Sequence, residues 1–385
     1  MYTRMLRPAS KAFFLFGPRG TGKSTWSKQA FPGASRFDLL RASESLRFQK
    51  APSEFSAEVR AFPKDRWVIV DEIQKVPALL DEIHSLMEND GYNHFVLTGS
   101  SARKLRRGAA NLLAGRATQK SLFPLNSFET NFSLPPEQVL NFGLLPESVN
   151  AQSDEAREDY LNAYVETYLQ EEIKAEALVK DVGSFARFVQ VGALVAAQTT
   201  NVSGVARDAG VGRETVRGYF EVLEDTLLGS WLPAYRPRAK IKEIGLPKFY
   251  WFDAGVLRAA FDGFRQPLPS DYRGVLLEHW INHEMLSYMH YGRVKGSLGY
   301  WSTPSESKID FLWWYGEAFV AIEVKAGKEF RSEFLKGITS FSQGKKLKRS
   351  FVVYLGSKEM KVGQTWIFPV QKFLKELYAG GVFGG

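Results

Sequence analysis

The sequence contains no cysteine. Disulfide bonds and thiolate metal sites are therefore excluded, and the absence agrees with a reducing compartment. The N-terminus, Met-Tyr-Thr-Arg-Met-Leu-Arg-Pro, has no apolar core of the kind that a secretory signal needs. No stretch approaches the roughly 18 consecutive apolar residues of a membrane span. We therefore expect a cytoplasmic protein that is not membrane-bound.

The composition is that of a large globular protein with a basic surface. The chain has 385 residues, of which 44% are hydrophobic and 24% charged, so two or three domains are expected. The formal net charge is +8. A basic excess favours a phosphate-rich partner such as nucleic acid, and it is equally compatible with a solvated basic surface.

A phosphate-binding loop is the strongest motif. The apolar run over residues 12–16 predicts a buried strand, and a helical pattern begins at Ser24. Between them the pattern G-x-x-x-x-G-K-[ST] is complete. Glycines let backbone N–H groups face the phosphates, the lysine neutralises phosphate charge and the serine binds Mg²⁺. The expected ATP-binding residues are Gly17, Pro18, Arg19, Gly20, Thr21, Gly22, Lys23, Ser24 and Thr25.

Further apolar runs predict a parallel sheet around this loop. They cover residues 36–40, 67–70, 94–97 and 119–123, with helical patterns between them. Asp71 and Glu72 follow the second of these runs. Asp71 is expected to hold Mg²⁺, and Glu72 to activate the attacking water, which favours ATP hydrolysis over binding alone.

Two more polar sites are candidates for the same chemistry. Thr98 and Ser100 follow the next strand and could sense the γ-phosphate, although turn formation explains them equally well. Arg116 could serve as an arginine finger, acting in trans within a homo-oligomer. Arg103 is its rival, and a solvated surface arginine is the alternative to both.

Together these residues resemble an AAA+ ATPase, in particular the bacterial and archaeal group with an N-terminal AAA domain and a C-terminal domain of unknown function. The resemblance extends over residues 95–101, 112–116 and 122–128, and over Leu246-Pro-Lys-Phe-Tyr-Trp-Phe-Asp-Ala-Gly255. It implies the use of ATP and Mg²⁺ and oligomeric assembly. It supplies no substrate.

A helix-turn-helix pattern occupies residues 202–223. Gly210 provides the turn, and Val216, Tyr219 and Leu223 follow at helical spacing. In a DNA-binding unit, Arg213, Thr215 and Arg217 would face the groove or the phosphates, and the basic stretch 236–248 would form a wing. A unit that serves only for packing is the alternative.

The C-terminal segment carries Asp310 and the pair Glu323-x-Lys325 on two predicted strands, with Glu278 on a preceding predicted helix. This order of residues resembles restriction-endonuclease-like domains. There, two carboxylates hold a metal ion and the lysine positions water or stabilises phosphorane charge. A degenerate site that only binds nucleic acid is the alternative.

The predicted fold class is α/β. An AAA+ parallel-sheet core is expected over residues 1–135, a helical linker or lid over 136–185, a winged-helix-like unit over 186–265 and a restriction-endonuclease-like domain over 266–385. The predicted function is ATP hydrolysis that drives DNA binding, remodelling or translocation. The alternatives are an ATP-gated, metal-dependent nuclease and a slow ATPase switch that binds a protein partner.

Overall fold

The computed structural model describes residues 2–99, 113, 115–169, 181–236, 245–303 and 307–383. The chain forms two compact units. One comprises Leu6–Pro124 with Asp225–Leu228, and the other comprises Met1–Met5, Leu125–Glu224 and Gly229–Gly385. The segments expected to form the lid, the winged-helix-like unit and the endonuclease-like domain therefore lie in one compact unit. The four-part division stays a prediction.

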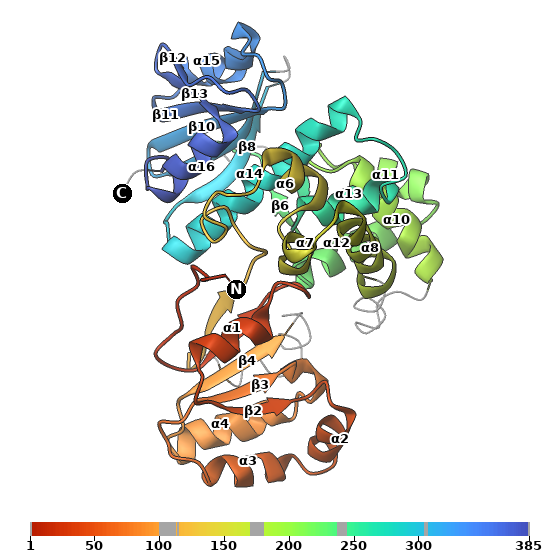
Figure 1. Ribbon diagram of the computed structural model, residues 1–385, viewed down its shortest axis with the longest axis vertical. Coiled ribbons are helices and arrows are strands. Elements are labelled where there is room, and N and C mark those ends of the chain that lie inside the picture. The colour runs from red at the N-terminus through yellow and green to blue at the C-terminus, as the bar shows by residue number, and fades with distance from the viewer. Residues whose placement is uncertain are drawn as a thin grey trace. The chain divides into compact units, whose positions relative to one another are not determined.

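The first unit contains a five-stranded parallel sheet with the strand order β2-β3-β4-β1-β5 (Figure 1). All five strands predicted from apolar runs are present, which confirms the α/β class. β4 pairs with both β1 and β3. The elements are β1 (Phe13–Phe16), α1 (Lys23–Ala30), β2 (Ser35–Asp38), α2 (Ala42–Lys50), α3 (Pro52–Arg60), β3 (Val68–Asp71), η1 (Ile73–Lys75), α4 (Leu79–Asn89), β4 (Phe95–Gly99) and β5 (Thr118–Ser121).

Alternating side chains of β1 pack against helices on the two faces of this sheet. Phe13 contacts Trp26 of α1 edge to face, with 6.2 Å between the ring centroids. Phe14 and Phe16 face the other way, into a core shared with Phe55 of α3 and other buried residues of α2 and α4. Because both faces are buried, the three central strands β1, β3 and β4 read as continuous apolar runs, and polar residues follow at their carboxyl ends.

The second unit begins with short helices that pack around α13. The motif that ends in Asp253-Ala-Gly255 explains part of this packing. Asp253 caps α13 by accepting a hydrogen bond from Val256 N at 3.0 Å, and it also accepts one from Leu144 N at 2.7 Å. A Cβ atom on Gly255 would lie 2.4 Å from the carbonyl group of Phe142, so only glycine permits this contact. The elements are α6 (Pro136–Phe142), α7 (Pro146–Asn150), α8 (Asp154–Ala163), the π-helix η2 (Tyr164–Tyr168), α10 (Val182–Leu194) and α13 (Ala254–Asp262).

Two helices and a two-stranded sheet follow α10 in this unit. Helix α11 (Val202–Ala209) ends at Gly210, which has the left-handed backbone that the turn requires, and α12 (Arg213–Asp225) follows. Strands β6 (Gly229–Leu232) and β7 (Lys248–Trp251) pair in antiparallel fashion.

The C-terminal part is a mixed six-stranded sheet with the strand order β12-β13-β11-β10-β9-β8. Ile338 and Phe341 of α15 cover one face of it. On the other face Phe351 contacts Phe373 of α16. The elements are α14 (Ser270–Gly292), β8 (Ser297–Ser302), β9 (Lys308–Tyr315), β10 (Ala318–Lys325), η3 (Ser332–Leu335), α15 (Lys336–Ser342), β11 (Leu347–Tyr354), β12 (Met360–Val362), β13 (Thr365–Pro369) and α16 (Val370–Tyr378).

The helices of the described segments include none that is long and apolar enough to cross a membrane.

The packing of α15 on β9 leads to a testable prediction. A Cβ atom on Gly337 would lie 1.6 Å from the carbonyl oxygen of Lys308, so we expect Gly337→Ala to destabilise the second unit by about 1–3 kcal/mol. A Cβ atom on Gly218, in α12 of the same unit, would have open space for 4 Å around it, so Gly218→Ala should be neutral or stabilise by up to about 1 kcal/mol. Denaturant unfolding of the full chain measures both changes. Equal effects of the two substitutions would contradict the proposed close contact.

Candidate functional site

The phosphate-binding loop links β1 to α1 at the carboxyl edge of the parallel sheet. Gly20 and Gly22 have positive φ angles of 82° and 89°, which only glycine adopts without strain. A Cβ atom on Gly17 would lie 2.4 Å from the carbonyl oxygen of Leu122, so glycine is required there by close packing. The loop backbone is thus shaped by residues that have no side chain.

Lys23 and Ser24 open helix α1. The buried Lys23 Nζ donates hydrogen bonds to the carbonyl oxygens of Gly17 and Pro18, at 2.7 Å and 3.1 Å. Its ammonium group is therefore held against the loop that would surround the phosphates. Ser24 Oγ donates to Asp71 Oδ2 at 2.7 Å. The two expected Mg²⁺ ligands, one in the first turn of α1 and the other at the end of β3, are thus in direct contact.

Thr98 connects Asp71, the last residue of β3, to Glu72, which follows it. The Thr98 hydroxyl donates a hydrogen bond to Asp71 Oδ1. It also accepts a hydrogen bond from the backbone N–H of Glu72, with 3.2 Å between the nitrogen and the oxygen. This arrangement depends on the sheet order, because β4 lies between β1 and β3. Ser100, the other residue expected to sense the γ-phosphate, lies outside the described residues.

Glu72 has a left-handed backbone, with φ 59° and ψ 49°. A glutamate rarely adopts this conformation, and such residues cluster at functional sites. Its carboxylate accepts a hydrogen bond from the side-chain amide of Gln74. Sequence reasoning missed Gln74, since a polar residue two positions after the acidic pair carries no signal of its own.

Arg116 lies near the amino-terminal ends of β1 and β5, whereas the phosphate-binding loop of the same chain lies at the carboxyl ends of the strands. Arg116 precedes β5, whose first residue Thr118 pairs with Phe13 at the start of β1, whereas the loop follows Phe16 at the end of β1. Its guanidinium pairs with Glu88. A role at its own nucleotide site is therefore incompatible with this position, and only the role in trans stays a prediction. Arg103 lies outside the described residues.

The structure brings together Glu278, Asp310, Glu323 and Lys325, which the sequence placed on separate elements. Asp310 is fully buried, and its Oδ2 accepts a hydrogen bond from Val324 N at 3.0 Å. The backbone N–H of Asp310 in turn donates to Glu323 Oε2 at 3.3 Å. Lys325 Nζ pairs with Glu323 Oε1 at 2.5 Å and lies 3.7 Å from Asp310 Oδ2.

Sequence reasoning missed three residues of this carboxylate cluster. Lys248 of β7 lies 3.8 Å from Glu278 and 4.0 Å from Asp310. Lys308 lies 3.4 Å from Asp310, and Tyr250 donates a hydrogen bond to Glu278 at 3.0 Å. The motif that contains Lys248 was visible in the sequence, but nothing in it indicated contact with strands about 60 residues further along the chain.

The electrostatics of the cluster follow from burial and from these lysines. Burial, together with the negative charge of Asp310, raises the pKa of Glu323 to about 8. Burial alone would also raise the pKa of Asp310, but the ammonium groups of Lys325, Lys248 and Lys308 hold it below its ordinary value. Burial raises the pKa of Glu278 as well. Asp310 is thus the charged member, and it is stabilised by lysine ammonium groups.

The candidate DNA-contacting residues Arg213, Thr215 and Arg217 are all exposed on α12. Arg213 and Arg217, four residues apart, share one face of that helix, whereas Thr215 lies on the side of the buried Tyr219. The two arginines therefore mark the exposed face of α12.

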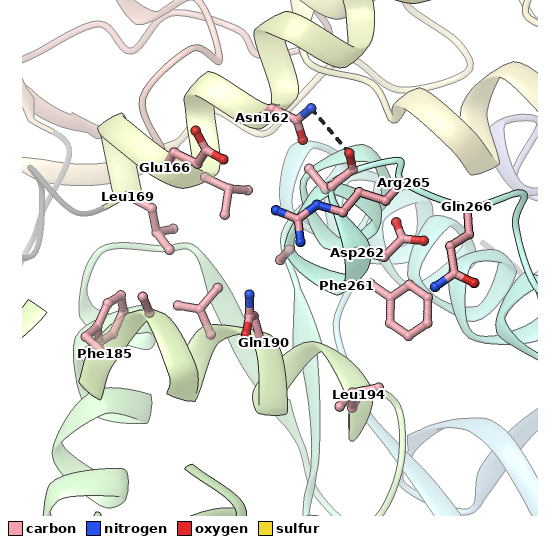
Figure 2. Close-up of a pocket in the computed structure, with 16 residues that line it drawn as sticks. Asn162, Glu166, Leu169, Phe185, Gln190, Leu194, Phe261, Asp262, Arg265 and Gln266 are labelled. Atoms are coloured by element: carbon pink, nitrogen blue, oxygen red, sulfur yellow. Dashed lines mark hydrogen bonds between the residues drawn. The ribbon is translucent and has the colours of Figure 1, made fainter. Parts of the chain in front are cut away.

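A cavity of about 370 Å³ lies elsewhere, between the π-helix η2, α10 and the end of α13 (Figure 2). Its floor is apolar, with Leu169, Phe185 and Val189, and Glu166 and Arg265 lie at its rim. It contains none of the residues that the sequence singled out. The cavity is therefore separate from the phosphate-binding loop and from the carboxylate cluster, which we identify by their polar contacts.

Models of known families match three consecutive segments of the chain. Residues 9–131 match an AAA domain, residues 136–267 match a domain of unknown function (DUF8612), and residues 273–373 match another domain of unknown function (DUF4143). No curated protein matches the chain.

Solved structures with partial similarity include the ADP form of the Aeropyrum pernix ORC2 protein. It is 14% identical, with 71% of this chain and 88% of that chain covered and a TM-score of 0.31. The Bacillus subtilis DNA clamp loader delta protein is 16% identical, with 55% and 83% covered and a TM-score of 0.26. A Vibrio cholerae protein is 12% identical, with 96% of both chains covered and a TM-score of 0.22. The assignment below rests on the family models.

The position of Thr98 gives a prediction for the nucleotide site. Thr98→Val keeps the shape of the side chain but removes the hydroxyl that joins Asp71 to the backbone of Glu72. We expect kcat for ATP hydrolysis to fall about 100-fold with little change in KM, because the acidic residues lose their alignment. Thr98→Ser retains the hydroxyl and should keep most of the activity. Equal turnover by the valine and serine variants would exclude this role.

Proposed function

We propose that this chain, whose residues 9–131 match an AAA domain, binds Mg-ATP at residues 17–25 and hydrolyses it. The observation that carries this proposal is the convergence of Ser24 and Thr98 on Asp71 at the end of β3. The sequence alone placed Ser24 at the start of a helix and the other two residues at the ends of separate strands. Their contact supports a single site that combines phosphate binding with an acidic pair.

The residues of this site have distinct roles in the proposed reaction. Backbone N–H groups of the loop and the Lys23 ammonium bind the phosphates. Ser24 Oγ and Asp71 Oδ2, which are 2.7 Å apart, are oxygen donors of the kind that Mg²⁺ prefers and would hold it together. The ion, when bound, neutralises charge on the phosphate oxygens.

Glu72 is the proposed base that orients and deprotonates the attacking water. Gln74 holds its carboxylate, and Thr98 holds its backbone N–H. A glutamate fixed in this way has few alternative rotamers, so little ordering is needed when nucleotide binds.

Arg116 is proposed to act on the nucleotide site of a neighbouring copy. The phosphate-binding loop of the same chain lies at the opposite ends of the strands. The Arg116 guanidinium is near the surface, where it pairs with Glu88. An arginine that completes a site in trans stabilises charge on the transferred phosphoryl group, and it makes hydrolysis dependent on assembly. The proposal therefore includes a homo-oligomer.

DNA is the proposed partner of the second unit. Helices α11 and α12, with the pair β6 and β7 after them, have the order of a winged helix-turn-helix, and Arg213, Thr215 and Arg217 are exposed on α12. The four residues at the end of α12 and after it, Asp225–Leu228, belong to the ATPase unit, where Leu227 packs against the core. A chain segment thus leads directly from the candidate DNA-contacting helix into the ATPase unit, which supports coupling of hydrolysis to DNA binding, remodelling or translocation.

The two alternative functions differ in what they require. A metal-dependent nuclease needs carboxylates that are open to a cation, and the lysines around Asp310 disfavour it. A slow ATPase switch that binds a protein partner needs no DNA. DNA-stimulated ATP hydrolysis separates the proposed function from this second alternative.

Two substitutions test the ATPase assignment. Lys23→Ala should abolish ATP binding, because the loop loses the cation that neutralises the phosphates. Glu72→Gln should retain ATP binding and lower kcat by about 10²–10⁴-fold, because the amide cannot accept the proton of the attacking water. Binding of a fluorescent ATP analogue and phosphate release measure the two effects. Normal turnover by Glu72→Gln would show that another group activates the water.

A double substitution tests the DNA assignment. Arg213→Ala with Arg217→Ala should weaken duplex binding and reduce the slope of log affinity against log salt concentration by about 2, because two phosphate contacts are lost. It should also abolish DNA stimulation of ATP hydrolysis but leave the basal rate unchanged. Arg60→Ala with Arg66→Ala, which removes two exposed arginines of the ATPase unit, is the charge-matched control. Equal losses in the control and the double variant would indicate a general charge effect.

A further inference from the structure

Lys248 reaches the carboxylate cluster from outside the C-terminal sheet. It belongs to β7, which pairs with β6, and its side chain is 8% exposed. The ammonium group lies 3.8 Å from Glu278 Oε2 and 4.0 Å from Asp310 Oδ1, over the ring of Tyr300 at 5.2 Å from the centroid. A buried cation therefore lies between two of the three carboxylates that the sequence grouped as a possible metal site.

The cluster already holds ample positive charge without a metal ion. Lys248, Lys308 and Lys325 each lie within 4.0 Å of Asp310, the charged carboxylate of the cluster. A divalent ion added to this set would leave two positive charges uncompensated beside a fully buried aspartate. Uncompensated charge in such surroundings is strongly unfavourable.

The oxygen atoms of the cluster are also not arranged as a ligand set. Divalent cations need several oxygen atoms at about 2.0–2.6 Å. Asp310 Oδ2 and Glu323 Oε1 are instead engaged with Val324 N and Lys325 Nζ. Among the described residues, no group of three or more His, Cys, Asp or Glu side chains is placed to hold a metal ion.

Asp310 Oδ1 is the one oxygen of this buried aspartate that accepts no hydrogen bond of good geometry from the described residues. It faces the Lys308 and Lys248 ammonium groups, at 3.4 Å and 4.0 Å. Lys308 is 54% exposed, whereas Lys248 is almost wholly enclosed. Of the two lysines, only Lys248 fills interior space between carboxylates.

We propose that the Lys248 ammonium takes the place of the divalent cation in this site, so that the C-terminal domain is closed to metal by a residue of β7. The site retains the acidic residues of a metal-dependent nuclease but is held together by lysine. Loss of the Lys248 charge opens it to a divalent cation bound by Asp310 and Glu278. This inference does not rest on the proposed ATPase function.

The test is Mn²⁺ binding to the full-length protein without nucleotide, measured by electron paramagnetic resonance and by calorimetry. We expect Lys248→Met to bind Mn²⁺ at least about 100-fold more tightly than the wild type, because it removes the ammonium group that lies between Asp310 and Glu278. The additional substitution Asp310→Asn should remove this binding, which assigns the ion to this site and not to the nucleotide loop. Lys248→Arg keeps the cation and should bind no more Mn²⁺ than the wild type.

Lys308→Met is the matched control, since it removes a lysine charge beside the same carboxylate but from an exposed side chain. It should leave Mn²⁺ affinity close to that of the wild type. Asp310-dependent Mn²⁺ binding by the wild type would overturn the proposal, as would equal gains in the Lys308 and Lys248 variants. If Lys248→Met does not fold, Lys248→Gln replaces it, and a folded glutamine variant without Mn²⁺ binding also overturns the proposal.

Discussion

Acidic side chains that are removed from water require compensation, and this constraint determines which segments of the chain meet. Asp71 is satisfied by hydroxyl groups of Ser24 and Thr98. Asp310 is satisfied by a backbone N–H and surrounded by lysines. Glu284 of α14 accepts hydrogen bonds from the hydroxyl of Ser127 and, at 2.6 Å, from that of Tyr378. In each case the donors come from segments distant in sequence, so each carboxylate fixes a tertiary contact.

The nucleotide site and the carboxylate cluster use this constraint in different ways. At Asp71 the partners are small hydroxyl groups, and the proposed Mg²⁺ ion would bind beside them. At Asp310 the partners are lysines, which supply the positive charge themselves. Similar acidic residues are therefore proposed to hold a metal ion in one unit and to form a site closed to metal in the other.

The chain passes between the two compact units at Asp225–Leu228. This segment follows α12, belongs to the unit of the parallel sheet, and is followed by β6 of the second unit. Leu227 has a positive φ of 61°, which a leucine adopts only when its surroundings hold it in place. The proposed coupling of hydrolysis to DNA would use this connection.

The sequence by itself determined the parallel sheet, the nucleotide loop and the acidic pair, because each is encoded locally. Strands buried on both faces appear as apolar runs, and the loop needs glycine and lysine at fixed spacing. The sequence also identified Glu278, Asp310, Glu323 and Lys325 as one group. Only the tertiary structure decided that Thr98 joins Asp71 to Glu72, that Gln74 holds Glu72, and that Arg116 lies away from its own loop. The tertiary structure also placed Lys248 among the carboxylates. Strand order and contacts between segments distant in sequence depend on packing, which local sequence patterns do not predict.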